Sequence, residues 1–156
     1  MIGWLEPAQR ALDARPDPLS VFFRDDDVGW GDAALFRLCD VFEEFAIPLD
    51  LAVIPSAATP ALLERLSARA RRLDLHQHGY AHVNHEPEGR KSEFGAARSV
   101  AAQYADIAHG RELLMAVLGD RVQPIFTPPW NRCTAGRGRS VGNCNTGKGP
   151  PSLACQ

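Results

Sequence analysis

Apolar and polar positions along the chain follow two periods, one typical of buried strands and one of amphipathic helices. Short apolar runs predict strands at residues 20–24, 47–54, 73–77 and 122–126. Leucine and phenylalanine at helical spacing predict helices at residues 5–14, 33–45, 60–71 and 92–118. Strands that alternate with helices of this length indicate βαβ units and a parallel sheet.

Residues at the ends of the predicted helices support their limits. Asp32 is expected to cap the second helix, Thr59 and Pro60 to begin the third, and Gly119 to end the fourth. The side chains expected on buried helix faces are Leu35, Leu38, Cys39, Phe42, Phe45, Leu62, Leu63 and Leu66.

Length and composition are those of one soluble globular domain. The chain has 156 residues, of which 45% are hydrophobic and 23% charged. Its net charge of -2 favours neither a nucleic acid nor an anionic membrane as partner, and it leaves the oligomeric state open. The first residues do not resemble a secretory signal, and no apolar run approaches the roughly 20 residues that span a bilayer. We therefore expect a cytoplasmic protein.

The composition changes after Arg132. Residues 133–156 contain no Asp or Glu and few large apolar side chains, and they are rich in Gly, Arg, Cys and Asn. Such a segment buries too little surface to offset the entropy of ordering it. The sequence therefore predicts a folded part at residues 1–132 and a disordered tail at residues 133–156. An altered reading frame is a hypothesis that accounts for such a tail.

Two groups of potential metal ligands stand out. Four of the five histidines, His76, His78, His82 and His85, lie within ten residues, and neutral imidazole is the commonest metal ligand. Asp25, Asp26 and Asp27 follow the first predicted strand, and adjacent carboxylates are best tolerated around a cation. Both groups, and Trp130, follow strands whose carboxyl ends meet at one edge of a parallel sheet. This predicts a metal site of two histidines and one carboxylate; a solvated histidine-rich loop is the alternative.

Three segments in order resemble the motifs of the polysaccharide deacetylase family, the NodB-homology fold of carbohydrate esterase family 4. They are residues 24–29 (Arg-Asp-Asp-Asp-Val-Gly), 74–82 (Asp-Leu-His-Gln-His-Gly-Tyr-Ala-His) and 126–130 (Phe-Thr-Pro-Pro-Trp). The resemblance spans residues 20–132. It implies an α/β fold, an incomplete (β/α) barrel of the NodB type with about four parallel strands and flanking helices. Residues 1–132 would then be the N-terminal part of such a domain.

The resemblance also implies a function and roles for particular residues. The chain would be a metal-dependent hydrolase that removes acetyl groups from an N-acetylated carbohydrate or a related amide, a non-peptide carbon–nitrogen bond. The family's aspartate pair matches either Asp25 and Asp26 or Asp26 and Asp27, and we prefer the second register. Asp26 would then be the general base. Asp27, His78 and His82 would bind a divalent metal, with zinc the expected ion.

Further residues are candidates around this site. The resemblance implies that the backbone N–H of Trp130 holds the oxyanion, although packing is an alternative role for its ring. His76 alternates with His78 on a strand and is a candidate to line the site or orient a ligand. Asp25 and His85 are candidates through proximity alone; a solvated or capping carboxylate and a surface histidine are the alternatives that we favour for them.

The chain also departs from the family pattern. Thr127 stands at the usual third-motif arginine, and no histidine after His109 is available as the family's general acid. We therefore expect weak catalysis or none. A non-catalytic metal- or carbohydrate-binding remnant is the main alternative. A two-histidine, one-carboxylate iron enzyme is another, although the predicted helices do not suit the antiparallel barrel that usually carries that site.

Overall fold

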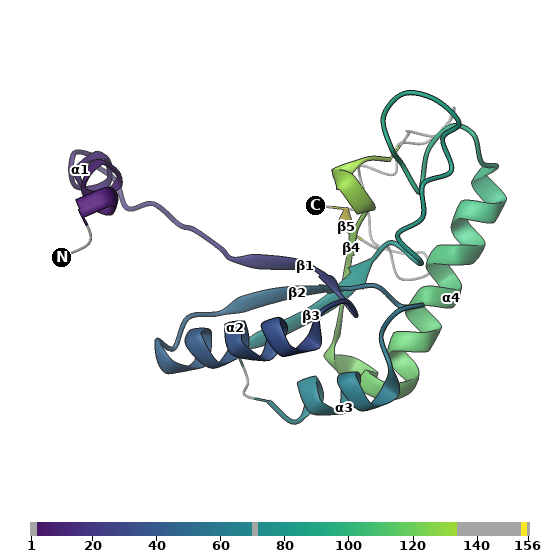
Figure 1. The fold of residues 1–156 in the computed structure, drawn as a ribbon, viewed down its shortest axis with the longest axis horizontal. Helices are drawn as coiled ribbons and strands as arrows, with labels where there is room; N and C mark the ends of the chain where they lie inside the picture. Colours follow the sequence, from purple (N-terminus) through teal and green to yellow (C-terminus); the bar gives the residue numbers. More distant parts are fainter. Residues whose placement is uncertain (1–2, 70–71, 134–153, 156) are drawn as a thin grey trace, which may run out of the picture.

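The computed structural model describes residues 3–69, 72–133 and 154–155. Its centre is a parallel sheet with the strand order β1-β2-β3-β4-β5 (Figure 1). The strands are β1 (Arg24–Val28), β2 (Leu49–Val53), β3 (Leu73–His78), β4 (Val122–Thr127) and the two-residue β5 (Ala154–Cys155). The predicted α/β class, with about four parallel strands and flanking helices, is confirmed.

Three helices cover one face of this sheet. The long helices are α1 (Glu6–Asp13), α2 (Asp32–Glu44), α3 (Pro60–Ser67) and α4 (Val100–Leu118), and short 3-10 turns lie at Gly3–Leu5, Gly119–Arg121 and Pro129–Asn131. Sequential parallel strands joined by right-handed crossovers place α2, α3 and α4 on the same side. Buried residues of these three helices accordingly form one core with the strands. Helix α1 stands apart at the end of an extended segment and buries no residue (Figure 1).

The two faces of the sheet differ in polarity. Leu49 and Leu51 of β2, like Leu75 of β3, belong to the core beneath the helices. Because side chains alternate along a strand, Asp50 and His76 point to the opposite face. One face is therefore apolar and covered by helices, whereas the other carries charged and polar groups. A singly wound sheet of this kind is consistent with an incomplete (β/α) barrel.

The first strand lies later in the chain than predicted. Val21 and Phe22 are exposed, and β1 begins at Arg24, so the three aspartates form part of the strand instead of following it. The physical reason is the position of β1 at the edge of the sheet, where it pairs with β2 alone among the described strands. An edge strand tolerates charged side chains because one side of it stays open to solvent.

The helix limits are confirmed in part. Thr59 caps α3 by accepting a hydrogen bond from the Leu62 N–H, and Gly119, at a φ of 55°, ends α4. The cap predicted at Asp32 is wrong: Gly31 is the capping residue, with a φ of 76° and no side-chain bond, and Asp32 is the first helical residue. The expected buried side chains are confirmed at Leu35, Cys39, Leu62, Leu63 and Leu66, whereas Leu38 and Phe42 are partly buried and Phe45, beyond the end of α2, is exposed.

The fourth helix starts eight residues later than predicted. Ser99 caps it through the Ala102 N–H, and the preceding residues form an irregular segment in which Glu93 and Phe94 are buried. The inward position of these two side chains is incompatible with a continuous surface helix from residue 92.

The predicted tail is described only at Cys133 and at β5, where Ala154 and Cys155 pair with Ile125 and Phe126; the rest of that prediction falls on residues outside the described ranges. None of the helices in the described part of the chain is both long and apolar enough to cross a membrane.

Candidate metal centre

Three side chains from separate segments converge beyond the carboxyl ends of the strands. Asp27 lies near the end of β1, His78 is the last residue of β3, and His82 lies in the loop that follows. The Asp27 Oδ1 atom is 3.2 Å from His78 Nε2 and 3.2 Å from His82 Nε2. The three potential ligand atoms all lie within 4.8 Å of one another. These are the three residues that the sequence predicts as metal ligands.

The protonation states around this group suit a cation. The Nδ1 atom of His78 lies 3.1 Å from the Thr127 carbonyl oxygen. In a neutral imidazole, Nδ1–H donates to that oxygen and the lone pair of Nε2 faces Asp27. The Oδ1 atom of Asp27 is itself buried and has no hydrogen-bond partner. Ligand lone pairs that face one another in this way are satisfied by a metal ion, and this set of two imidazoles and one carboxylate could hold one.

Burial keeps His78 in the form that binds a metal. Burial lowers the pKa of His78 below its usual value, and the carboxylates of Asp26 and Asp27 oppose this effect without cancelling it. The neutral imidazole therefore dominates at neutral pH.

Backbone strain is concentrated at the same place. Among the described non-glycine residues five have a positive φ, and four of them lie at this site: Asp27 (66°), His82 (56°), Trp130 (55°) and Asn131 (52°). Such conformations are unfavourable for residues with a Cβ atom, and they cluster at functional sites. At Asp27 the strain coincides with a register shift of β1 between Asp25 and Val28, which interrupts the regular alternation of the strand.

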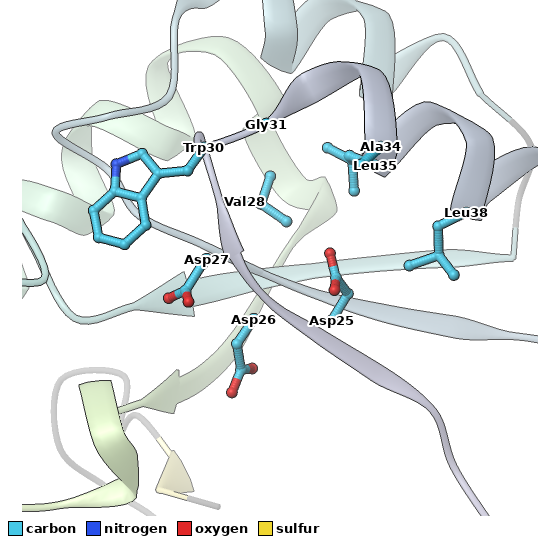
Figure 2. Close-up of a pocket in the computed structure, with 9 residues that line it drawn as sticks. All are labelled: Asp25, Asp26, Asp27, Val28, Trp30, Gly31, Ala34, Leu35 and Leu38. Atoms are coloured by element: carbon cyan, nitrogen blue, oxygen red, sulfur yellow. The ribbon is translucent and has the colours of Figure 1, made fainter.

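The irregularity of β1 coincides with different directions of the three aspartate side chains. Figure 2 shows the Asp25 side chain on the side of Leu35 and Leu38 of α2, whereas Asp26 and Asp27 point away from that helix. Asp25 therefore does not join Asp27, His78 and His82, which together form the candidate ligand group. Burial raises its pKa, and the neighbouring carboxylates of Asp26 and Asp27 raise it further.

A pocket of ≈ 350 Å³ lies along this part of β1 and the start of α2 (Figure 2). Its lining residues are Asp25, Asp26, Asp27, Val28, Trp30, Gly31, Ala34, Leu35 and Leu38. The pocket adjoins Asp27 but neither histidine, so it lies beside the ligand group.

Asp26 is held by an arginine of its own strand. The Arg24 Nε atom is 2.8 Å from Asp26 Oδ1, and Arg24 Nη2 donates to Asp26 Oδ2 at 3.2 Å. The same Nη2 atom donates to Asn131 Oδ1 at 3.1 Å, which ties β1 to the turn after β4. One hydrogen bond and one ion pair from the same guanidinium restrain the position of the Asp26 carboxylate. Residues two apart on a strand share a face, which allows Arg24 to reach Asp26.

The remaining predicted residues lie at different distances from the centre. His76 is buried and its Nε2 atom is 2.9 Å from Thr127 Oγ1, so it supports the strand ends instead of joining the ligand group. His85 is exposed and is also not part of the group. The Trp130 ring centroid is 4.4 Å from that of His82. Trp30, which the sequence did not indicate, contacts the same histidine ring at 5.0 Å.

The buried His76 predicts a pH dependence of stability in the metal-free protein. Burial, with a smaller effect of Arg24, lowers the pKa of His76 from 6.5 to about 4. The unfolded chain therefore binds more protons between these values, so stability is full above pH 6.5 and falls towards pH 4. The loss is expected to reach about 3 kcal/mol. Urea unfolding in chelator at several pH values measures it; an unchanged pH dependence in His76→Asn would contradict the assignment.

Comparison with known proteins adds no further information about this site. No protein-family model, curated protein sequence or solved structure matches the chain.

Proposed function

We propose that this chain is a metal-dependent hydrolase of the polysaccharide deacetylase type, with a NodB-like partial barrel. Its substrate would be an N-acetylated carbohydrate or a related amide. The observation that carries the proposal is a carboxylate outside the ligand group, Asp26, adjacent in sequence to the ligand Asp27 and held in place by Arg24. A ligand set with an oriented carboxylate beside it that does not bind the metal suits hydrolysis better than metal storage.

Each residue of the centre has a role in this proposal. A zinc ion held by Asp27, His78 and His82 would supply Lewis acidity toward water and an acyl carbonyl. Asp26 accepts the proton of the attacking water, and Arg24 keeps its carboxylate oriented for that step. Trp30 and Trp130 contact the His82 ring and limit its movement. The backbone N–H of Trp130 is the proposed donor to the oxyanion.

The departures from the family pattern affect two proton transfers differently, the removal of a proton from water and the protonation of the leaving amine. The position of the usual third-motif arginine is occupied by the buried Thr127, and Arg24 supplies a guanidinium to the proposed base from β1. Among the residues that the structure describes, no comparable replacement for the general acid lies at the site. His109 lies on α4 with an exposed side chain, 3.8 Å from Glu112. The leaving amine of an amide therefore lacks a proton donor, a role worth about 10²–10⁴-fold.

This difference gives a direct test with an activated ester. The leaving group of 4-nitrophenyl acetate departs without protonation, so the zinc-loaded chain is expected to hydrolyse it while N-acetylated sugars show negligible deacetylation. Asp26→Asn is expected to lower the ester rate about a hundredfold, because it removes the proposed base. Steady-state rates measure both effects, after subtraction of the rate of hydrolysis by zinc in buffer without the protein.

The outcomes separate the proposed functions. Ester hydrolysis that is unchanged in Asp26→Asn would contradict the hydrolase mechanism. If the chain binds zinc but shows no ester hydrolysis that depends on Asp26, the result would instead support the non-catalytic metal-binding alternative. Robust turnover of N-acetylated sugars would show that the reaction needs no histidine acid.

A further inference from the structure

One carboxylate of the described structure, that of Glu93, is fully buried close to the metal centre. Glu93 lies in the irregular segment before α4 and has no exposed surface. It accepts hydrogen bonds from three successive backbone N–H groups, those of Tyr80 (3.3 Å), Ala81 (2.7 Å) and His82 (3.2 Å). Successive N–H groups that converge in this way form an anion-binding concavity, and here the anion is a side chain of the same protein.

The loop that Glu93 holds is the loop that carries His82. Gly79 and His82 both have positive φ values, 57° and 56°. For His82 this conformation is strained, and the charged hydrogen bond from its own N–H helps to offset the cost. The backbone sets the direction of the Cα–Cβ bond, so the φ of His82 contributes to the placement of its Nε2 atom 3.2 Å from Asp27 Oδ1.

The start of the same loop is fixed by other contacts. The Gly79 N–H donates to the Thr127 carbonyl oxygen at 3.0 Å, and Gln77 Nε2 donates to the Gly79 carbonyl oxygen at 2.8 Å. These bonds anchor the loop where it leaves β3 but do not reach His82. The three N–H groups of residues 80–82 are bound by Glu93.

We propose that Glu93 is a positioning residue of the metal centre, which holds the 80–82 loop so that His82 can bind the metal with Asp27 and His78. This inference rests on the metal centre of the proposed function but not on the reaction assigned to it. Residues that orient metal ligands typically change metal affinity by about 10–100-fold when they are replaced.

Glu93→Gln is the direct test because it keeps the size of the side chain and removes its charge. Its amide group also turns one acceptor into a donor, which cannot pair with backbone N–H groups. With cobalt(II) as the probe, the variant is expected to bind about ten- to a hundredfold more weakly than the parent and to show an altered visible absorption spectrum. The spectrum reports ligand geometry, which a loss of stability alone does not change.

Glu86→Gln is a matched control from the same region. The Glu86 Oε1 atom accepts a hydrogen bond from the Ala97 N–H at 3.1 Å, so this variant also removes a carboxylate bound to backbone. It does not touch residues 80–82, and the cobalt affinity and spectrum are expected to match those of the parent.

Parent-like affinity and spectrum in folded Glu93→Gln would overturn the inference. If that variant does not fold, Glu93→Asp decides, because a carboxylate one methylene shorter cannot reach all three N–H groups. Its affinity is expected to fall as well, and an affinity equal to that of the parent would overturn the inference. A chain that binds cobalt normally but hydrolyses no ester would refute the proposed reaction alone and leave the role of Glu93 intact.

Discussion

The double replacement His78→Ala, His82→Ala is expected to abolish specific metal binding. The parent chain should hold about one zinc ion after dialysis, and the variant none, because a single carboxylate from Asp27 is a poor site for a transition metal. Elemental analysis of the purified proteins measures the difference. Bound metal also stabilises the folded chain, by about 2.7 kcal/mol when free zinc exceeds the dissociation constant a hundredfold, so thermal unfolding gives a second measurement.

A neighbouring histidine provides the control for this experiment. His85 lies in the same cluster of the sequence but is exposed and outside the ligand group. His85→Ala is therefore expected to keep both the zinc content and the zinc-dependent stabilisation of the parent. Equal metal content in the double variant and the parent would refute the site.

The second large effect is expected from Gly79→Ala. Gly79 has a φ of 57°, and a Cβ atom built there would overlap the Glu93 Oε2 atom and lie 2.6 Å from Pro129 Cγ. Neither neighbour moves easily, because Glu93 is held by three hydrogen bonds and Pro129 belongs to a strained turn. We expect a loss of at least about 3 kcal/mol in the free energy of unfolding, a large part of the stability of a small domain.

Gly89→Ala separates backbone strain from the overlap of atoms. Gly89 also has a positive φ, 78°, but a Cβ atom there would meet nothing within 4 Å. The expected cost is therefore only that of the left-handed conformation, about 1–2 kcal/mol. Urea unfolding of both variants gives the comparison, and similar losses would show that the space around Gly79 is less restricted than its neighbours imply.

The two histidines of the candidate metal centre were predictable from the sequence because their signal is local. The four-residue spacing of His78 and His82 is visible in the chain itself, and the alternation of strands and helices places strand ends at one edge of a sheet. The preferred register makes Asp27, not Asp26, the third candidate ligand, and Asp27 is the aspartate that lies with His78 and His82, at a positive φ and beside the register shift of β1. That irregularity is not encoded in any pattern of apolar residues.

Other parts of the site were not predictable because they depend on tertiary contacts. Glu93 lies in a polar stretch where a glutamate is normally solvated, and only the folded loop brings three N–H groups to it. The apolar run at Val21 and Phe22 predicts a buried strand, yet both side chains are exposed. Periodicity identifies residues suited to a strand but does not show what will cover them.

The position of β1 at the edge of the sheet has a kinetic consequence for a bound metal. Asp27 belongs to this strand, whereas His78 and His82 belong to β3 and its loop, so a metal would join the two across β2. Edge strands open locally at lower free energy than the centre of a sheet. Detachment of β1 would therefore remove one of the three candidate ligands without global unfolding, and we expect the residence time of a bound ion to follow amide exchange in β1.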